Sequence, residues 1–178
     1  VITRVVKPQS ILEIGVANGM STAYILGALN DENISPESVT IHAIDRPQFA
    51  YQIRERRGKF GIEGRGGLIP DNKEVGWLAS NDIKSNYNYQ LHIGDFTHIL
   101  EDILETSGNL DLAVYDASKD SDEMKFAYQR CINKLNGEGV LISDDVLVND
   151  TFENMIEPQD GKFNIINDTG IYRNVRLS

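Results

Sequence analysis

Short apolar runs alternate along this chain with longer segments whose apolar positions recur at helical spacing. Several of the short runs contain almost no polar residue, which is typical of parallel strands that helices cover on both faces. The expected strands are Ile11–Ile14, Val39–Asp45, Tyr89–Ile93, Leu110–Tyr115 and Val140–Ser143.

The segments between these strands predict amphipathic helices. The longest apolar stripe runs from Met124 to Leu135. Asp120 and Glu123 before it resemble a capping box, and Gly137 after it is the expected stop signal. Two shorter stripes have the same spacing, one from Thr22 to Leu29 and one from Phe96 to Leu104.

The end of the chain has a different pattern. Residues 162–178 predict two strands joined by a turn at Asn167–Gly170, which is a hairpin. Strand–helix alternation that ends in a hairpin indicates an α/β sheet, mostly parallel, with one antiparallel element. The chain has no internal repeat, and 178 residues are enough for one substantial core. We therefore expect a single domain over residues 1–178.

One segment interrupts the alternation. Residues 58–81 are rich in glycine and are longer than the loops that normally connect a helix to the next strand. We expect little order up to about Pro70 and a helix that starts near Asn72. Long loops of this kind serve as lids over a site or are plain flexible insertions, and both interpretations stay open.

Composition narrows the classes of function. The formal net charge is −10 and no basic run offsets it, which argues against a nucleic-acid partner. No apolar run approaches the roughly 20 residues that span a bilayer, so no membrane partner is expected. The single cysteine, Cys131, excludes an internal disulfide and indicates a reducing, cytoplasmic compartment. Because the chain begins at Val1 rather than Met, we expect its N-terminus to be truncated.

The most informative motif follows the first expected strand. Glu13 stands near the end of that strand, and Gly15 and Gly19 bracket the turn into the next helix. Glycines at such a turn let the backbone approach a ligand, and the start of the helix offers free N–H groups. The spacing Gly-x-x-x-Gly differs from the dinucleotide fingerprint G-x-G-x-x-G, and the preceding acid suits an amino-bearing ligand better than a phosphate. A purely structural turn remains the alternative.

Two further strand ends carry acids at the same sheet edge. Asp45 ends the second strand, where a carboxylate can accept hydrogen bonds from two ribose hydroxyls. Asp95 and Phe96 follow the third strand, after Gly94, where a carboxylate and an aromatic ring could frame an adenine. Each of the two acids could instead cap the helix that follows it.

Together these motifs resemble class I S-adenosylmethionine-dependent methyltransferases. The stretches that carry the resemblance are ILEIGVANG, the aspartate after the second strand, GDF after the third and LISDDV after the fifth. From about Ser10 to Arg176 the chain is more narrowly similar to the small-molecule group known as methyltransferase domain 24. The resemblance implies a Rossmann-like, doubly wound, mostly parallel seven-stranded sheet with a C-terminal antiparallel hairpin.

The resemblance also implies S-adenosyl-L-methionine as the cofactor. By that analogy the glycine motif would hold the amino-acid part, the acid after the second strand the ribose, and GDF the adenine. The residues expected to bind the cofactor are Glu13, Gly15, Ala17, Asn18, Gly19, Ser21, Asp45, Arg46, Gly94, Asp95, Phe96 and Asp116.

A second cluster of acids is expected where the fourth and fifth strands end. Asp116 follows the fourth strand, Asp144 and Asp145 follow the fifth, and neighbouring strands lie about 4.8 Å apart. Carboxylates this close repel one another unless a cation lies among them, and Mg²⁺ or another hard divalent cation prefers oxygen ligands. We therefore expect these three acids to bind a metal. Alternatively, Asp144 and Asp145 cap the next helix while Asp116 lines the cofactor pocket.

Metal-dependent catechol-type O-methyltransferases are similar at this cluster. They carry an aspartate and, three residues later, a lysine after the fourth strand, and Asp-Asn after the fifth. The chain matches at Asp116, Lys119 and Asp144 and departs at Asp145, where that group has asparagine. The similarity implies Lys119 as the general base beside Asp116, although a lysine before a helix is often only solvated.

We therefore expect an enzyme that transfers a methyl group from S-adenosylmethionine to an oxygen of a small molecule, assisted by Mg²⁺ or another divalent cation. A catalytically degenerate cofactor-binding domain of a larger protein is one alternative. A nicotinamide-dependent oxidoreductase is the other, disfavoured by the spacing of the glycines. A homo-oligomer stays open.

Overall fold

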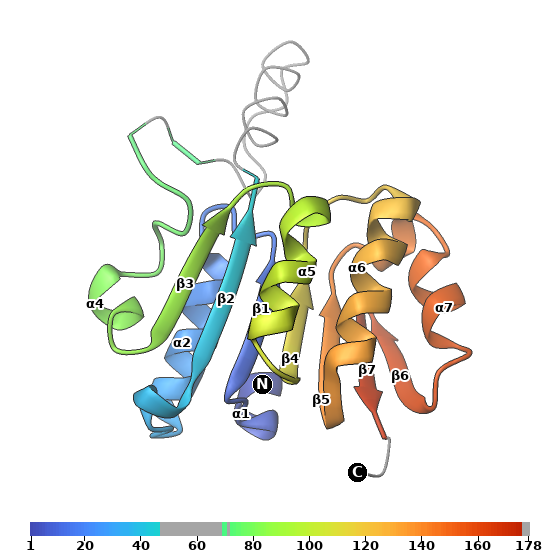
Figure 1. Ribbon diagram of the computed structural model, residues 1–178, viewed down its shortest axis with the longest axis horizontal. Helices are drawn as coiled ribbons and strands as arrows, with labels where there is room; N and C mark the ends of the chain where they lie inside the picture. Colours follow the sequence, from blue (N-terminus) through green and yellow to red (C-terminus); the bar gives the residue numbers. More distant parts are fainter. Residues whose placement is uncertain (47–68, 71, 176–178) are drawn as a thin grey trace.

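The computed structural model of the protein describes residues 1–46, 69–70 and 72–175, and these contain a single seven-stranded sheet (Figure 1). The strand order across the sheet is β3–β2–β1–β4–β5–β7–β6. The strands are β1 (Ser10–Ile14), β2 (Thr40–Asp45), β3 (Asn88–Ile93), β4 (Leu110–Tyr115), β5 (Leu135–Ser143), β6 (Gly161–Ile166) and β7 (Thr169–Asn174).

The order of the strands confirms the predicted doubly wound fold. Strands β1 to β5 are parallel, whereas β7 runs antiparallel to β5 and to β6. From β1 the chain moves outward to β2 and β3 and then returns to the other side of β1 as β4. The direction of winding reverses between β1 and β4, and ligands of such sheets bind at that point, beyond the carboxyl ends of the strands.

Helices cover both faces of the sheet. Figure 1 shows α5 and α6 in front of the sheet and α2 behind it. The helices are α1 (Ile2–Val6), α2 (Met20–Asp31), α4 (Asn81–Lys84), α5 (Phe96–Thr106), α6 (Ser121–Lys134) and α7 (Thr151–Ile156), with 3₁₀ turns η1 (Pro36–Ser38) and η2 (Val146–Val148). Among the described residues, no helix combines the length and the apolar character needed to cross a membrane.

Two hydrophobic cores follow from the alternation of side chains along each strand. Leu12 of β1 faces the core beneath α5 and α6, whereas its neighbour Ile11 faces the core beneath α2. Both side chains are fully buried. The near-continuous apolar runs that predicted the strands therefore reflect burial on both faces of the central strands.

The structure corrects two predicted boundaries. Helix α6 ends at Lys134 and β5 begins at Leu135, so Gly137 lies inside the strand and does not terminate the helix. Pairing of Leu135 with Leu110 and a hydrogen bond from the Asn174 side chain to the Leu135 carbonyl draw this residue into the sheet.

No helix starts near Asn72 either. Residues 72–80 form turns, and α4 begins at Asn81, where the Ser80 side chain caps it. The φ angle of Gly76 is +73°, which is incompatible with a continuous right-handed helix. Half of the proposed lid, residues 58–68 and 71, lies outside the described residues.

The C-terminal hairpin agrees with its prediction, whereas the capping box at the start of α6 is only half formed, because the Asp120 N–H donates to Ser118 Oγ (3.1 Å) and not to Glu123. The Asp120 side chain accepts hydrogen bonds from the N–H groups of Asp122 and Glu123. In the hairpin, Ile166 pairs with Thr169 across a tight turn, and Asn167 takes the left-handed conformation that asparagine tolerates.

One carboxylate ties together the amino ends of three strands. Asp111 in β4 accepts hydrogen bonds from the N–H groups of Gln9 (2.8 Å) and Ser10 (3.1 Å), at the start of β1. It also accepts a bond from the side chain of Asn136 in β5. These contacts help to fix the alignment of β1, β4 and β5, whose other ends carry the candidate site.

We predict that Asp111→Ala lowers the free energy of unfolding by about 1–3 kcal/mol, because three partly exposed donors lose a charged acceptor. Denaturant titration measures this loss. The matched control Asp160→Ala removes an exposed acid before β6 and should change stability by less than about 0.5 kcal/mol. Equal losses in the two variants would show that Asp111 has no special role.

Candidate functional site

Acidic side chains follow the carboxyl ends of four neighbouring strands. Glu13 is the next-to-last residue of β1, Asp45 ends β2, Asp116 follows β4 and Asp144 follows β5. Because these strands are parallel, all four acids lie at one edge of the sheet, beside the switch point between β1 and β4.

The turn after β1, residues 15–19, packs directly against the end of β4. The Gly15 N–H donates to the Ile44 carbonyl (2.9 Å), and φ of Gly15 is +96°. A Cβ on Gly15 would lie 1.9 Å from the backbone oxygen of Asp116, so only glycine fits here. Ala17 is also left-handed, at φ +47°, and this costs free energy that its surroundings must offset.

Asp45 organises this glycine loop. Its Oδ2 accepts hydrogen bonds from the N–H groups of Val16 (2.9 Å) and Ala17 (2.7 Å), and the residue is only 9% exposed. The alternative prediction, a cap for a following helix, concerns residues from Pro47 on, which lie outside the described residues. Among the described residues only Oδ2 has hydrogen-bond donors, which leaves Oδ1 available to a ligand hydroxyl.

Glu13 and Ser21 bind each other. The Glu13 carboxylate is completely buried and accepts hydrogen bonds from the hydroxyls of Ser21 and Thr22, the latter at 2.6 Å. Burial raises the pKa of Glu13, the two hydroxyls oppose this shift, and the nearby carboxylates of Asp45 and Asp116 add to it. In this conformation Glu13 has no surface to offer a cofactor and acts by fixing the start of α2.

The residues after β3 are engaged in packing and capping. Asp95 accepts hydrogen bonds from the N–H and hydroxyl of Thr97 at the start of α5 and pairs with Arg46. Although burial opposes them, these bonds hold the pKa of Asp95 below its usual value. Phe96 is 4% exposed, and its ring packs edge-on against Tyr115. The Gly94 N–H donates to the Asp45 carbonyl (2.9 Å), which ties the β3 turn to β2.

The predicted metal ligands do come together. Single carboxylate oxygens of Asp116, Asp144 and Asp145 all lie within 4.8 Å of one another. The hydroxyl of Thr169 in β7 donates to Asp144 Oδ1 (3.2 Å) and orients that side chain. Burial raises the pKa of Asp116, the ammonium of Lys119 lowers it, and the carboxylates of Asp144 and Asp145 raise it again.

Lys119 supplies the positive charge at this cluster. Its Nζ lies 3.2 Å from Asp116 Oδ1, 3.4 Å from Asp145 Oδ2 and 3.2 Å from the backbone oxygen of Asp144. The side chain of Asn149 donates to the Lys119 carbonyl (3.0 Å) and helps to hold this segment in place. In this structure Lys119 is therefore the counter-ion of the Asp116 and Asp145 carboxylates.

Part of the segment 58–81 contacts the glycine loop, a contact that the sequence did not predict. Residues 75–80 lie beside Ala17 and Asn18 and donate two backbone hydrogen bonds to them. The sequence signals for this contact are weak: the small or apolar residues Val75 and Ala79 flank a glycine, and both are buried.

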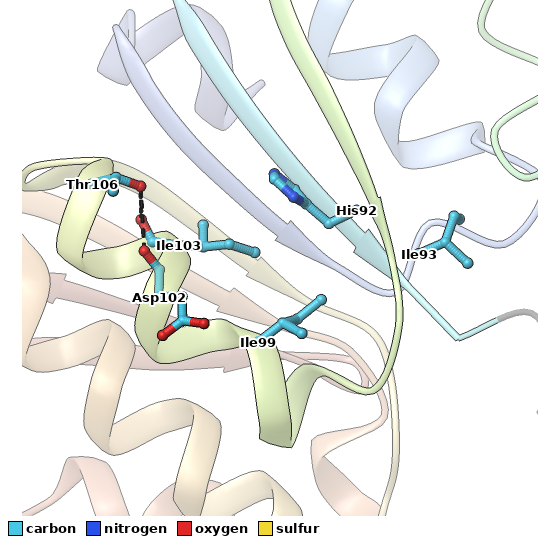
Figure 2. Close-up of a pocket in the computed structure, with 6 residues that line it drawn as sticks. All are labelled: His92, Ile93, Ile99, Asp102, Ile103 and Thr106. Atoms are coloured by element: carbon cyan, nitrogen blue, oxygen red, sulfur yellow. Dashed lines mark hydrogen bonds between the residues drawn. The ribbon is translucent and has the colours of Figure 1, made fainter.

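An open hollow of about 430 Å³ lies between β3 and α5 (Figure 2). His92 contributes one wall and shares a 3.1 Å hydrogen bond with His42 of β2, and burial lowers the pKa of both imidazoles. None of the predicted cofactor or metal residues lines it. The chemistry of the strand ends therefore locates the site better than the size of this hollow.

Comparison with known proteins supports the predicted family. The model of a methyltransferase domain family, methyltransferase domain 24, matches residues 12–146. No curated protein matches the chain in sequence.

Three solved structures show the same fold. An O-methyltransferase from Bacillus cereus in complex with S-adenosylhomocysteine has a TM-score of 0.62 and 14% identity, and the match covers 98% of this chain and 77% of that one. The methyltransferase PaMTH1 of Podospora anserina, also bound to S-adenosylhomocysteine, has a TM-score of 0.60 and 18% identity, and the match covers 99% of this chain and 75% of that one. The O-methyltransferase TomG of Streptomyces achromogenes, in complex with S-adenosylmethionine, has a TM-score of 0.56 and 16% identity, and the match covers 97% of this chain and 76% of that one.

Glu13 should give the protein a measurable pH dependence. Because its folded-state pKa is raised above the unfolded value of about 4.3, the folded state binds more protons in the window above that value. Stability contributed at this site is therefore lost as pH rises from the unfolded pKa through the folded one. We predict that Glu13→Gln removes this decline, measured as the free energy of unfolding from about pH 4.5 to 7.5.

The control for this experiment is Glu105→Gln, an exposed glutamate on α5. Its stability curve should run parallel to that of the wild type over the same pH range. A Glu13→Gln curve that is also parallel to the wild type would show that the Glu13 pKa is not raised.

Proposed function

This chain belongs to the methyltransferase domain family whose model spans residues 12–146, and from that premise we propose that it transfers a methyl group from S-adenosylmethionine to an oxygen of a small-molecule acceptor. The observation that carries the proposal is the convergence of Asp45, Asp116 and the glycine loop at the switch point of the sheet. A divalent cation at the acidic cluster completes the proposed site.

The residues at this edge fit the cofactor by charge and by hydrogen bonding. S-Adenosylmethionine carries a positive sulfonium and an ammonium group, which suit an edge lined by Asp45 and Asp116. Oδ1 of Asp45, which has no donor within the described part of the chain, can accept a bond from a ribose hydroxyl. In our proposal Gly94 and Asp95 lie toward the adenine, and Arg46 holds Asp95 in place through their ion pair.

The acidic cluster fits a hard divalent cation, with Asp116, Asp144 and Asp145 as ligands. A cation bound there would lower the pKa of the acceptor hydroxyl and orient it. Thr169 already holds Asp144 in place, as partners of metal ligands commonly do. The ammonium of Lys119 lies among the same oxygens, so its charge opposes the binding of a second cation.

Lys119 is the proposed general base. As the acceptor oxygen forms its bond to the methyl carbon and the carbon–sulfur bond breaks, the hydroxyl proton passes to Lys119 Nζ. This requires a neutral amine at Lys119, whose Nζ contacts the carboxylates of Asp116 and Asp145 in the structure. Release of Lys119 from those carboxylates is therefore a condition for the base role.

A small-molecule acceptor agrees with the surroundings of the cluster. Leu147 and Val148 lie two and three residues after Asp145 and are 65% and 56% exposed. They offer an apolar surface next to the charged groups, as small-molecule sites commonly do. The net charge of −10 disfavours a nucleic acid in this role.

The first test is binding of the cofactor product. We predict that the purified protein binds S-adenosylhomocysteine in calorimetry and that Asp45→Ala weakens binding at least about tenfold, because charge-assisted hydrogen bonds are lost. The control Asp102→Ala changes an exposed acid at the hollow beside α5 and should bind as the wild type does. Binding of NADH in place of S-adenosylhomocysteine would contradict the proposal.

The second test addresses the metal. In a calorimetric titration with Mn²⁺ or Mg²⁺, we predict that Asp144→Ala weakens binding about tenfold or more, because a ligand is removed. Lys119→Met should tighten metal binding, because it removes the competing ammonium. Lys125→Met alters an exposed lysine that pairs only with Asp122 among the described residues and should have no effect. Identical titrations for all four proteins would exclude this cluster as the metal site.

A further inference from the structure

The segment formed by residues 75–80, which we call the loop clamp, is bonded to the glycine loop through the backbone. The Gly76 N–H donates to the Ala17 carbonyl and the Leu78 N–H to the Asn18 carbonyl, both at 2.9 Å. Gly19 and Gly76 approach so closely that a Cβ on Gly19 would lie 2.6 Å from the Gly76 Cα. The two segments therefore fit only with glycine at the point of contact.

The clamp is in turn anchored to the body of the domain. Val75 is buried against Val16, in a small cluster with Ala43 of β2. The Nζ of Lys84, in α4, donates to the Gly76 carbonyl (3.0 Å) and lies 5.7 Å from the centre of the Tyr89 ring in β3. The clamp thus links the glycine loop to the outer strand of the sheet by apolar packing and by a charge-assisted bond.

These contacts determine which way the peptide groups of the loop point. A planar trans peptide directs its N–H opposite to its carbonyl. With the Ala17 carbonyl bonded to Gly76, the Asn18 N–H points away from the clamp, and among the described residues it has no hydrogen-bond acceptor. The next N–H, of Gly19, is already bonded to Val16 (2.8 Å).

We propose that the loop clamp is a positioning element for the cofactor: it holds the left-handed Ala17 and directs the Asn18 N–H at the carboxylate of S-adenosylmethionine. This inference rests on the proposed function, because it assigns a role in binding that cofactor. Gly76 and Lys84 are then positioning residues that touch the loop and act on affinity through it.

The test compares two glycines with nearly the same backbone conformation. Gly76 has φ +73° and Gly108, at the end of α5, has φ +72°, and a Cβ on Gly108 meets nothing within 4 Å. Alanine in this region is strained at either position, so Gly76→Ala and Gly108→Ala should both lose stability. Only Gly76→Ala should also raise the dissociation constant of S-adenosylhomocysteine, at least about fivefold, because only it disturbs the loop.

Lys84→Met provides a second variant that leaves the backbone of the clamp unstrained. It removes the hydrogen bond to the Gly76 carbonyl and, like Gly76→Ala, should raise the dissociation constant of S-adenosylhomocysteine. Its control is Lys125→Met, an exposed lysine of α6 whose side chain pairs with Asp122. Lys125→Met should bind as the wild type does.

The outcomes separate the two proposals. If the wild type binds S-adenosylhomocysteine and Gly76→Ala, Gly108→Ala and Lys84→Met all bind it with the same affinity as the wild type, the clamp is overturned and the proposed function stays intact. Equal weakening in Gly76→Ala and Gly108→Ala shows a general loss of stability and overturns it too. If Gly76→Ala does not fold, Lys84→Met measured against Lys125→Met decides. A wild type that does not bind S-adenosylhomocysteine overturns the proposed function and the clamp with it.

Discussion

Negative charge gathers at the carboxyl edge of this sheet, and the candidate site depends on how each carboxylate is compensated. Parallel strands end at a common edge, so Glu13, Asp45 and Asp116 are brought together by the topology itself. A buried carboxylate without a partner costs several kcal/mol. Hydroxyl groups compensate Glu13, backbone N–H groups compensate Asp45, and an ammonium compensates Asp116.

The kind of partner separates structural acids from acids that can receive a ligand. The hydroxyls on Glu13 belong to the first turn of α2 and are enclosed with it, so no ligand can replace them without opening that helix. The contact of Lys119 with Asp116 and Asp145 is different, because about half of each carboxylate side chain is exposed. A flexible lysine can leave such a contact, and a ligand cation can then take its place.

The sequence predicted the parts of this structure that depend on local pattern. Apolar runs located the central strands because both faces of those strands are buried, and the acids after them had to lie at one edge. It could not show that Phe96 turns into the core or that Ser21 is bound to Glu13, because side-chain direction depends on packing between distant elements. The contact of Gly76 with Gly19 joins residues far apart in the chain and leaves no periodic signal.

The hydrogen bonds of the glycine loop also bear on the rival cofactor class. A dinucleotide fold binds pyrophosphate through the free N–H groups that follow the first strand. Here the N–H groups of Val16 and Ala17 are bonded to the carboxylate of Asp45, and that of Gly19 to the Val16 carbonyl. A pyrophosphate would have to displace Asp45 and lie beside its charge. A cofactor with ribose hydroxyls can instead use the Asp45 carboxylate as a hydrogen-bond acceptor and leave it in place.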